Sequence, residues 1–126
     1  VEGESGFRVR EAKMIDQLSM MDNIVLATGG GAVTSEENRA NLKDRGTVVY
    51  LKAPIRQQVE RTSRDKNRPL LQTPDPEKTI RELMEIREPL YAEVADFSVD
   101  TFRRNPRSVS QEILRHLNEL SGDQSL

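Results

Sequence analysis

The pattern of hydrophobic and polar positions predicts alternating helices and strands. Between about Phe7 and Met20 the apolar residues recur at helical spacing, which indicates an amphipathic helix. Continuous apolar runs at 24–28 and 47–51 are typical of strands that are buried on both faces. Residues 97–101 alternate between apolar and polar like a third strand. The chain is therefore expected to combine helices with a sheet.

Two short helices are predicted in the first half of the chain. Thr34 followed by Glu37 is a capping-box pattern, and the helix that it opens should end before Gly46. Pro54 suits the first position of a second helix, which runs to about Arg64.

Two longer helices are predicted in the second half. One starts at Asp75 and should end or kink near Arg87, because Pro89 disfavours a helical residue before it. The other is capped by Asn105 and Pro106. Between the two halves, residues 64–76 hold three prolines and no periodic pattern, so they are predicted to form a lid-like loop.

Strands that alternate with helices predict an α/β fold, with a parallel β-sheet flanked by helices. A length of 126 residues suits one domain, and residues 121–126 are expected to fray. Such sheets bind ligands beyond the carboxyl ends of their strands. Two loops are predicted to lie there: the triplet Gly29–Gly31 and the loop after Thr101.

Composition narrows the function classes. The chain has no cysteine and a single histidine, His116, so disulfides, thiolate metal sites and a histidine metal cluster are excluded. No apolar run reaches the roughly 18–20 residues of a membrane helix. The net charge of −2, the five aromatic residues and the scattered arginines disfavour nucleic-acid binding. A cytoplasmic protein with no membrane or nucleic-acid partner is expected.

The basic residues are mostly arginine, with 14 Arg against 5 Lys. Arginine presents a planar fork that suits carboxylates and phosphates, although an arginine-rich genome would produce the same bias. Several arginines stand at predicted loops or helix ends, namely Arg61, Arg68, Arg87, Arg103 and Arg104. Each could be a solvated surface charge, but together they favour a polyanionic ligand such as a nucleotide.

Two further features have a functional and a structural interpretation. Gly29–Gly31 would let a ligand approach the backbone closely, or would merely form a turn. The triplet does not match the G-x-G-x-x-G dinucleotide pattern. Arg8 would bind an anion, or would pair with Glu11 three residues later on the same helix.

Four strings resemble bacterial shikimate kinase in order and spacing: Gly3–Glu11, Leu26–Val33, Arg68–Leu71 and Arg87–Tyr91. The resemblance covers the chain to about Leu120. It implies a three-layer P-loop fold like that of the nucleoside-monophosphate kinases. It also implies ATP-dependent phosphorylation of the 3-hydroxyl of shikimate, on the route to chorismate and the aromatic amino acids.

The resemblance also implies site residues. The implied shikimate-binding positions are Arg8, Glu11, Gly29, Gly30, Gly31 and Arg87. The implied ATP-binding positions are Arg61, Arg68, Arg104, Asn105 and Pro106, with Arg68 as the catalytic arginine of the lid. ATP and shikimate would be the partners of a monomer, with Mg²⁺ as the cofactor.

One family feature does not occur in the sequence. The G-x-x-x-x-G-K-[ST] loop that cradles phosphates is not present among these 126 residues. The chain is therefore expected to be the C-terminal part of a single kinase domain, inactive alone, with the Mg²⁺ site in an N-terminal part.

Two other functions are considered beside the kinase. A non-catalytic relative that binds shikimate or another anion would also lack the phosphate loop. A different small-molecule kinase, such as a gluconate kinase, is disfavoured by the combination of Phe7-Arg8 with Gly29–Gly31.

Overall fold

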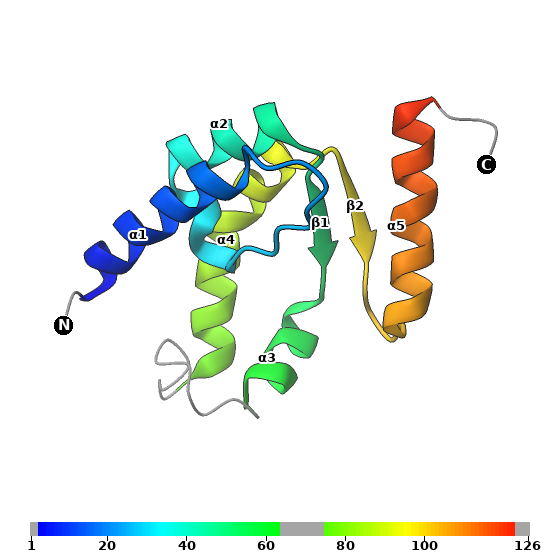
Figure 1. The fold of residues 1–126 in the computed structure, drawn as a ribbon. Helices are drawn as coiled ribbons and strands as arrows, with labels where there is room; N and C mark the ends of the chain where they lie inside the picture. Colours follow the sequence, from blue (N-terminus) through cyan, green and yellow to red (C-terminus); the bar gives the residue numbers. More distant parts are fainter. Residues whose placement is uncertain (1–2, 64–74, 123–126) are drawn as a thin grey trace. The chain divides into compact units, whose positions relative to one another are not determined.

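The computed structural model in Figure 1 describes residues 3–63 and 75–122. The described residues form two compact units, one made of 3–48 and 86–96, the other of 49–63, 75–85 and 97–122. Helix α4 (Pro76–Val94) contributes its two halves to different units. Within the described ranges, no helix is both long and apolar enough to cross a membrane.

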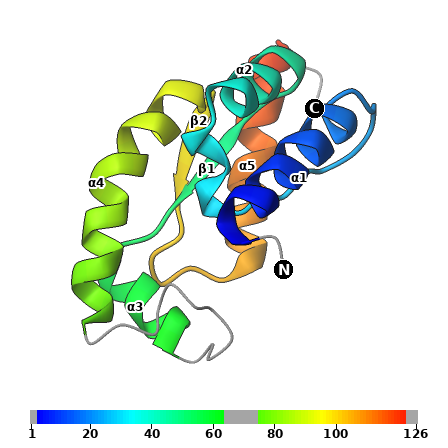
Figure 2. The ribbon, with the colours of Figure 1, turned by 90° about the vertical axis from the view of Figure 1, so that its left-hand side faces the viewer.

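The first unit contains helix α1 (Gly3–Leu18), the 3₁₀ helix η1 (Gly30–Thr34) and helix α2 (Glu36–Arg45). Helix α1 packs against α2 and η1, and Figure 2 shows α1 and α2 side by side. Buried side chains from all these elements and from the end of α4 form the core, namely Ile15, Ala32, Val33, Asn38 and Val94.

The cap of α2 differs from the predicted one. Ser35 is the N-cap, and its hydroxyl accepts a hydrogen bond of 3.2 Å from the Asn38 amide. Thr34 instead donates from its hydroxyl to the Gly31 carbonyl at 2.7 Å. A Ser or Thr hydroxyl can serve either purpose, so the sequence pattern located the helix start only to within one residue.

The predicted buried strand at 24–28 is wrong. This segment has no regular secondary structure, and the Val25 side chain is 99% exposed. An apolar run forms a strand only where another strand accepts its backbone hydrogen bonds. Within the described part of the chain, the sheet consists of two strands, and neither is this segment.

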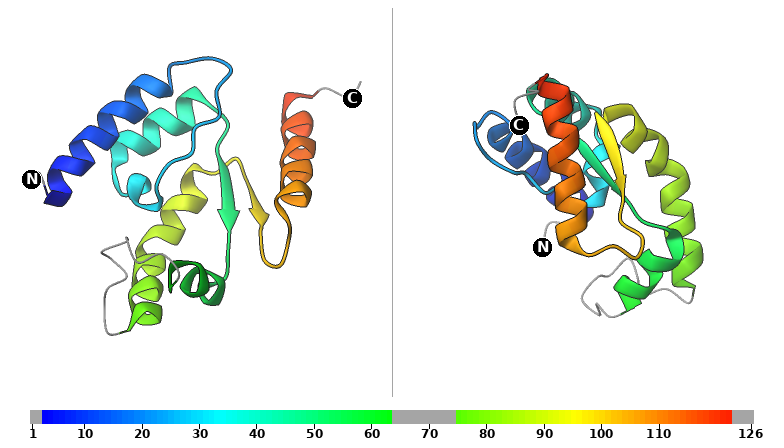
Figure 3. Two further views of the ribbon diagram at one scale, coloured as in Figure 1. Left: turned by 60° about the horizontal axis from the view of Figure 1, so that its bottom comes forward. Right: turned by 90° about the vertical axis from the view of Figure 1, so that its right-hand side faces the viewer.

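The second unit is built on strands β1 (Val49–Lys52) and β2 (Phe97–Asp100), which pair in parallel. Val99 is fully buried on β2. Helix α3 (Ile55–Ser63) follows β1, and helix α5 (Pro106–Ser121) follows β2 and runs beside it in both views of Figure 3. The predicted second and third strands and the predicted parallel sheet are confirmed.

Helix α4 does not end near Arg87, because it continues through Pro89 to Val94. A proline inside a helix removes one hydrogen bond, here to the carbonyl of Glu85. Glu85 and Pro89 both lie on the exposed side of α4, where water can solvate that carbonyl. The continuous helix brings Arg87 and Tyr91 into successive turns.

The final helix agrees with the prediction. Asn105 is the N-cap of α5, and its side chain accepts a hydrogen bond of 2.8 Å from the Ser108 amide. Pro106 is the first helical residue. Most of the predicted lid, including Arg68, lies outside the described residues.

Candidate functional site

The three consecutive glycines of the first unit each face a different side chain that was predicted to bind substrate. A Cβ atom at Gly31 would overlap the Arg8 guanidinium, 2.8 Å from its Cζ. At Gly30 it would lie 3.4 Å from Nη1 of Arg87. At Gly29 it would lie 3.7 Å from Oε2 of Glu11. The structure therefore brings together all six predicted shikimate-binding residues.

Space, and not backbone conformation, favours glycine at positions 30 and 31. The described glycines with positive φ are Gly3 and Gly122, so the triplet adopts angles open to any residue. The missing side chains at Gly30 and Gly31 instead let two guanidinium groups approach the main chain. These two arginines come from different helices, α1 and α4.

Arg8 and Glu11 form a close ion pair on α1. Arg8 Nη1 donates to Oε1 of Glu11 at 2.7 Å, and the Glu11 side chain is only 11% exposed. Glu4 lies further away, 4.0 Å from Arg8 Nη2. The pairing predicted as the structural alternative is present, but it also holds the guanidinium against Gly31. With Arg87 nearby at Gly30, the site favours an anion.

Tyr91 is a site residue that the sequence analysis did not assign. Its hydroxyl donates to the Gly30 carbonyl at 2.6 Å. Burial raises the pKa of the Tyr91 phenol above its ordinary value of 10.0, and the neighbouring Arg87 only partly opposes the rise. The phenol is thus protonated and a hydrogen-bond donor at neutral pH. Its spacing of four residues from Arg87 on one helix is the signal that would have found it.

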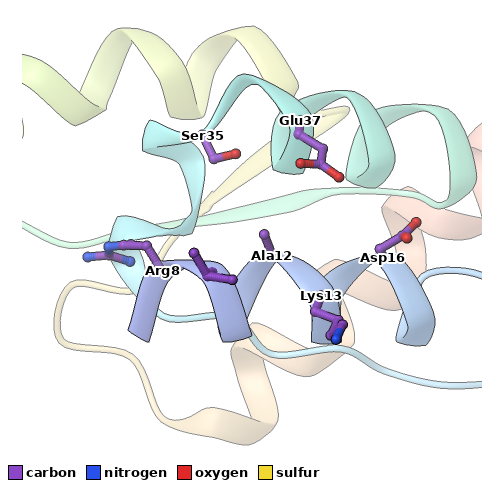
Figure 4. A pocket seen from close by; sticks show the side chains of 7 residues that line it. Arg8, Ala12, Lys13, Asp16, Ser35 and Glu37 are labelled. Carbon is purple, nitrogen blue, oxygen red and sulfur yellow. The ribbon is translucent and has the colours of Figure 1, made fainter. Parts of the chain in front are cut away.

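An open groove of about 420 Å³ runs along α1 beside the start of α2. Figure 4 shows Arg8 at one end of this groove and Asp16 at the other. Lys13, Asp16 and Glu37 give the groove both signs of charge. Its preference for an anion is therefore confined to the Arg8 end, next to the glycines.

The predicted ATP-binding residues that the structure describes lie in the second unit. Arg61 is exposed in the last turn of α3, and Arg104, Asn105 and Pro106 join β2 to α5. Because β1 and β2 are parallel, both segments follow the carboxyl edge of the sheet. The Thr101 amide donates to the Lys52 carbonyl at 2.9 Å and closes this edge.

The Arg104 guanidinium is held within its own loop. Nη1 donates to the Asp100 carbonyl at 3.0 Å and to Oε1 of Glu112 at 2.6 Å. Nη2 donates to the Ser108 hydroxyl and carbonyl at 2.9 and 3.1 Å. In this conformation Arg104 fixes the loop at the start of α5.

The ion pair between Arg104 and Glu112 makes the stability of this part of the fold depend on pH. The hydrogen bond from Arg104 lowers the carboxyl pKa of Glu112 below 4.5 and outweighs the opposing effect of partial burial. The folded state therefore gains stability that is complete above the ordinary glutamate pKa and is lost as pH falls through the lowered value.

We expect the melting temperature of Glu112→Gln to fall less than that of the wild type between pH 5 and pH 3. Thermal scans across this range measure it, with Glu77→Gln as a surface control, and parallel curves would contradict the expectation.

The described residues offer no ready metal site. Within residues 3–63 and 75–122, no three side chains of His, Cys, Asp or Glu gather closely enough to hold an ion. A Mg²⁺ ion therefore has no ligand set assigned in these ranges.

Comparisons with known proteins agree on one family. The family model described as shikimate kinase matches residues 1–118. A shikimate kinase of Chromohalobacter salexigens is 54% identical over 121 residues, which are 96% of this chain and 67% of the relative. A shikimate kinase of Pseudomonas entomophila is 57% identical over 119 residues, which are 94% of this chain and 69% of the relative.

Solved structures show the same relationship. The shikimate kinase from Acinetobacter baumannii in complex with shikimate superposes with a TM-score of 0.91 at 49% identity, covering 98% of this chain and 68% of that one. The shikimate kinase from Bacteroides thetaiotaomicron has a TM-score of 0.78 at 27% identity, covering 96% of this chain and 70% of that one. The predicted α/β kinase fold is confirmed.

Proposed function

The chain belongs to the shikimate kinase family, and we propose that its glycine triplet and the two flanking arginines bind shikimate. The reaction is transfer of the γ-phosphate of ATP to the 3-hydroxyl of shikimate. Each relative named above is a kinase, which favours this activity over a non-catalytic binding protein.

The observation that carries the proposal is the convergence of Arg8 and Arg87 on Gly31 and Gly30. Shikimate carries one carboxylate and several hydroxyl groups. Two guanidinium groups suit the carboxylate, because charge-assisted hydrogen bonds from arginine forks are strong and directional. Glycines beside them leave space for the ring and its hydroxyls to reach the main chain. Glu11 is positioned to keep Arg8 in place.

Residues 1–126 form, in this proposal, the C-terminal part of one kinase domain, and the chain spans about two thirds of the length of the relatives. Mg²⁺–ATP is the phosphoryl donor, with the ion held outside the described residues. The nucleotide is bound by Arg61, Asn105, Pro106 and the loop that Arg104 fixes. Arg68 of the lid neutralises charge that develops on the transferred phosphoryl group. The enzyme acts in the cytoplasm as a monomer.

The test compares shikimate with its methyl ester as a ligand of the complete kinase. The ester keeps the ring and hydroxyls but has no negative charge, so it cannot form charge-assisted hydrogen bonds with Arg8 and Arg87. We expect it to bind at least about tenfold more weakly by calorimetry, as the loss of hydrogen bonds to a charged group implies. Unchanged ATP binding is the control, and equal affinity for ester and acid would refute the carboxylate assignment.

A further inference from the structure

The segment from Gly29 to Thr34, which contains η1, is called the glycine loop below. Four successive carbonyl groups of this loop accept hydrogen bonds from side chains. Tyr91 Oη donates to Gly30 at 2.6 Å, and Thr34 Oγ1 donates to Gly31 at 2.7 Å. The next two carbonyls, of Ala32 and Val33, accept from Asn38 Nδ2 at 3.0 Å and from Arg39 Nη1 at 2.7 Å. Three of these four donors lie outside the loop, on α2 and α4.

We propose that Tyr91, Asn38 and Arg39 are positioning residues, which hold the glycine loop in register with Arg8 and Arg87. The proposal rests on the proposed function, since it takes the loop and its two arginines as the shikimate site. None of the three has to touch the substrate. Their effect is transmitted through the main chain of the loop and, for Tyr91, also through Arg87, whose side chain hydrogen-bonds the phenol.

Planar peptide groups explain how these bonds could act on a ligand. A carbonyl and the following N–H share one plane and point in opposite directions, so fixing one fixes the other. The bond from Tyr91 to the Gly30 carbonyl therefore sets the direction of the Gly31 amide. It also sets the side of Gly31 that faces Arg8, where no space for a Cβ remains.

Arg39 joins the loop to the helix that carries Arg87. While Nη1 donates to the Val33 carbonyl, Nε donates to Oε2 of Glu93 on α4 at 2.9 Å. Tyr91 and Glu93 thus attach the two ends of the loop to α4, within two turns of Arg87. Bonds at both ends leave little freedom for the loop to shift along that helix.

Asn38 is a polar side chain in a buried position, with only 1% of it exposed. Its Oδ1 atom has no hydrogen-bond partner among the described residues. Burying such an acceptor is unfavourable, and an apolar side chain of similar size would avoid the cost. The interaction that distinguishes asparagine here is the Nδ2 donation to the Ala32 carbonyl. Its benefit in this proposal is the fixed loop conformation.

The experiment measures steady-state kinetics of Tyr91→Phe and Asn38→Asp in the complete kinase. Tyr91→Phe removes only the donating hydroxyl, and Asn38→Asp replaces the donor with an acceptor at nearly constant volume. We expect the KM for shikimate to rise by about five- to tenfold in Tyr91→Phe, as the loss of one hydrogen bond implies. It should rise at least as much in Asn38→Asp, because the new carboxyl oxygen would face the Ala32 carbonyl oxygen at a buried position. The kcat and the KM for ATP should stay within about twofold, since the nucleotide site keeps its own contacts.

Tyr50→Phe is the matched control, because Tyr50 is the other tyrosine and lies on β1 in the second unit. Its KM for shikimate should not change. Tyr91→Phe decides the outcome if Asn38→Asp does not fold. An unchanged KM in Tyr91→Phe overturns the proposal if Arg8→Ala and Arg87→Ala still raise it. A lower kcat and melting temperature with unchanged KM would also overturn it, as a purely structural role. If the arginine variants leave the KM unchanged too, the proposed function itself fails.

Discussion

Replacement of Arg8 by alanine is expected to raise the KM for shikimate by about 100-fold or more, as the removal of one partner from a desolvated charge pair implies. The substrate carboxylate loses a guanidinium, and Glu11 loses its ion-pair partner at 2.7 Å. Because the Glu11 side chain is only 11% exposed, its uncompensated charge would also repel the carboxylate. Among the described residues Arg87 forms no ion pair with a carboxylate, so the KM of Arg87→Ala should rise less, by about tenfold to 100-fold.

Two further variants make this prediction specific. The double variant Arg8→Ala/Glu11→Gln should recover part of the lost affinity, because it removes the repelling carboxylate. Arg81→Ala is the matched control on α4, where Arg81 pairs with Glu77 at the surface at 2.8 Å. Its KM should be that of the wild type. Equal KM values for Arg8→Ala and the double variant would show that Glu11 does not act on the substrate charge.

Substitution of Gly31 by alanine is expected to lower kcat/KM for shikimate by about 100-fold, the loss that a displacement of about 1 Å at an active site can cause. The new Cβ would overlap the Arg8 guanidinium, so either Arg8 or the loop must move. Since Glu11 holds Arg8 and side-chain donors hold the loop carbonyls, both movements break hydrogen bonds.

The triplet supplies a graded comparison. A Cβ at Gly30 would come within 3.0 Å of Tyr91 Oη, whereas one at Gly29 would make an ordinary contact of 3.7 Å with Glu11. The loss in kcat/KM should therefore follow the order Gly31→Ala, Gly30→Ala, Gly29→Ala, from largest to smallest. Gly46→Ala, whose Cβ would meet only the Leu42 carbonyl oxygen at 4.0 Å, is the control. Equal losses across the triplet would show that the contacts of the new Cβ atoms are not the cause.

Local patterns predicted most elements of this fold, because helix spacing, caps and strand alternation are properties of adjacent residues. Asn105 and Pro106 located the start of α5, and the alternation at 97–101 located β2. The errors arose where distant residues decide the outcome. The run at 24–28 has the composition of a strand, but a strand needs a pairing partner. Helix α4 continues through Pro89, and the carbonyl left without a donor is that of the exposed Glu85, whose exposure the sequence does not reveal.

The candidate site was predictable to a different extent. The resemblance named Arg8, Glu11, the glycine triplet and Arg87, but not the pairing of each glycine with one side chain. Tyr91 could have been found from its spacing to Arg87. Asn38 could not, since a polar residue in the first turn of a charged helix gives no sign of being buried.

The ion pair on α1 also bears on the entropy of substrate binding. A long side chain that becomes immobile on binding costs about 0.5–1.5 kcal/mol, which weakens the complex. Arg8 has already lost this freedom in the free protein, since Glu11 fixes its guanidinium and the Phe7 ring lies 5.3 Å away. The conformational entropy of the Arg8 side chain is thus lost when the protein folds and not when the substrate binds. In the proposed site, shikimate would therefore meet a cation that is already oriented.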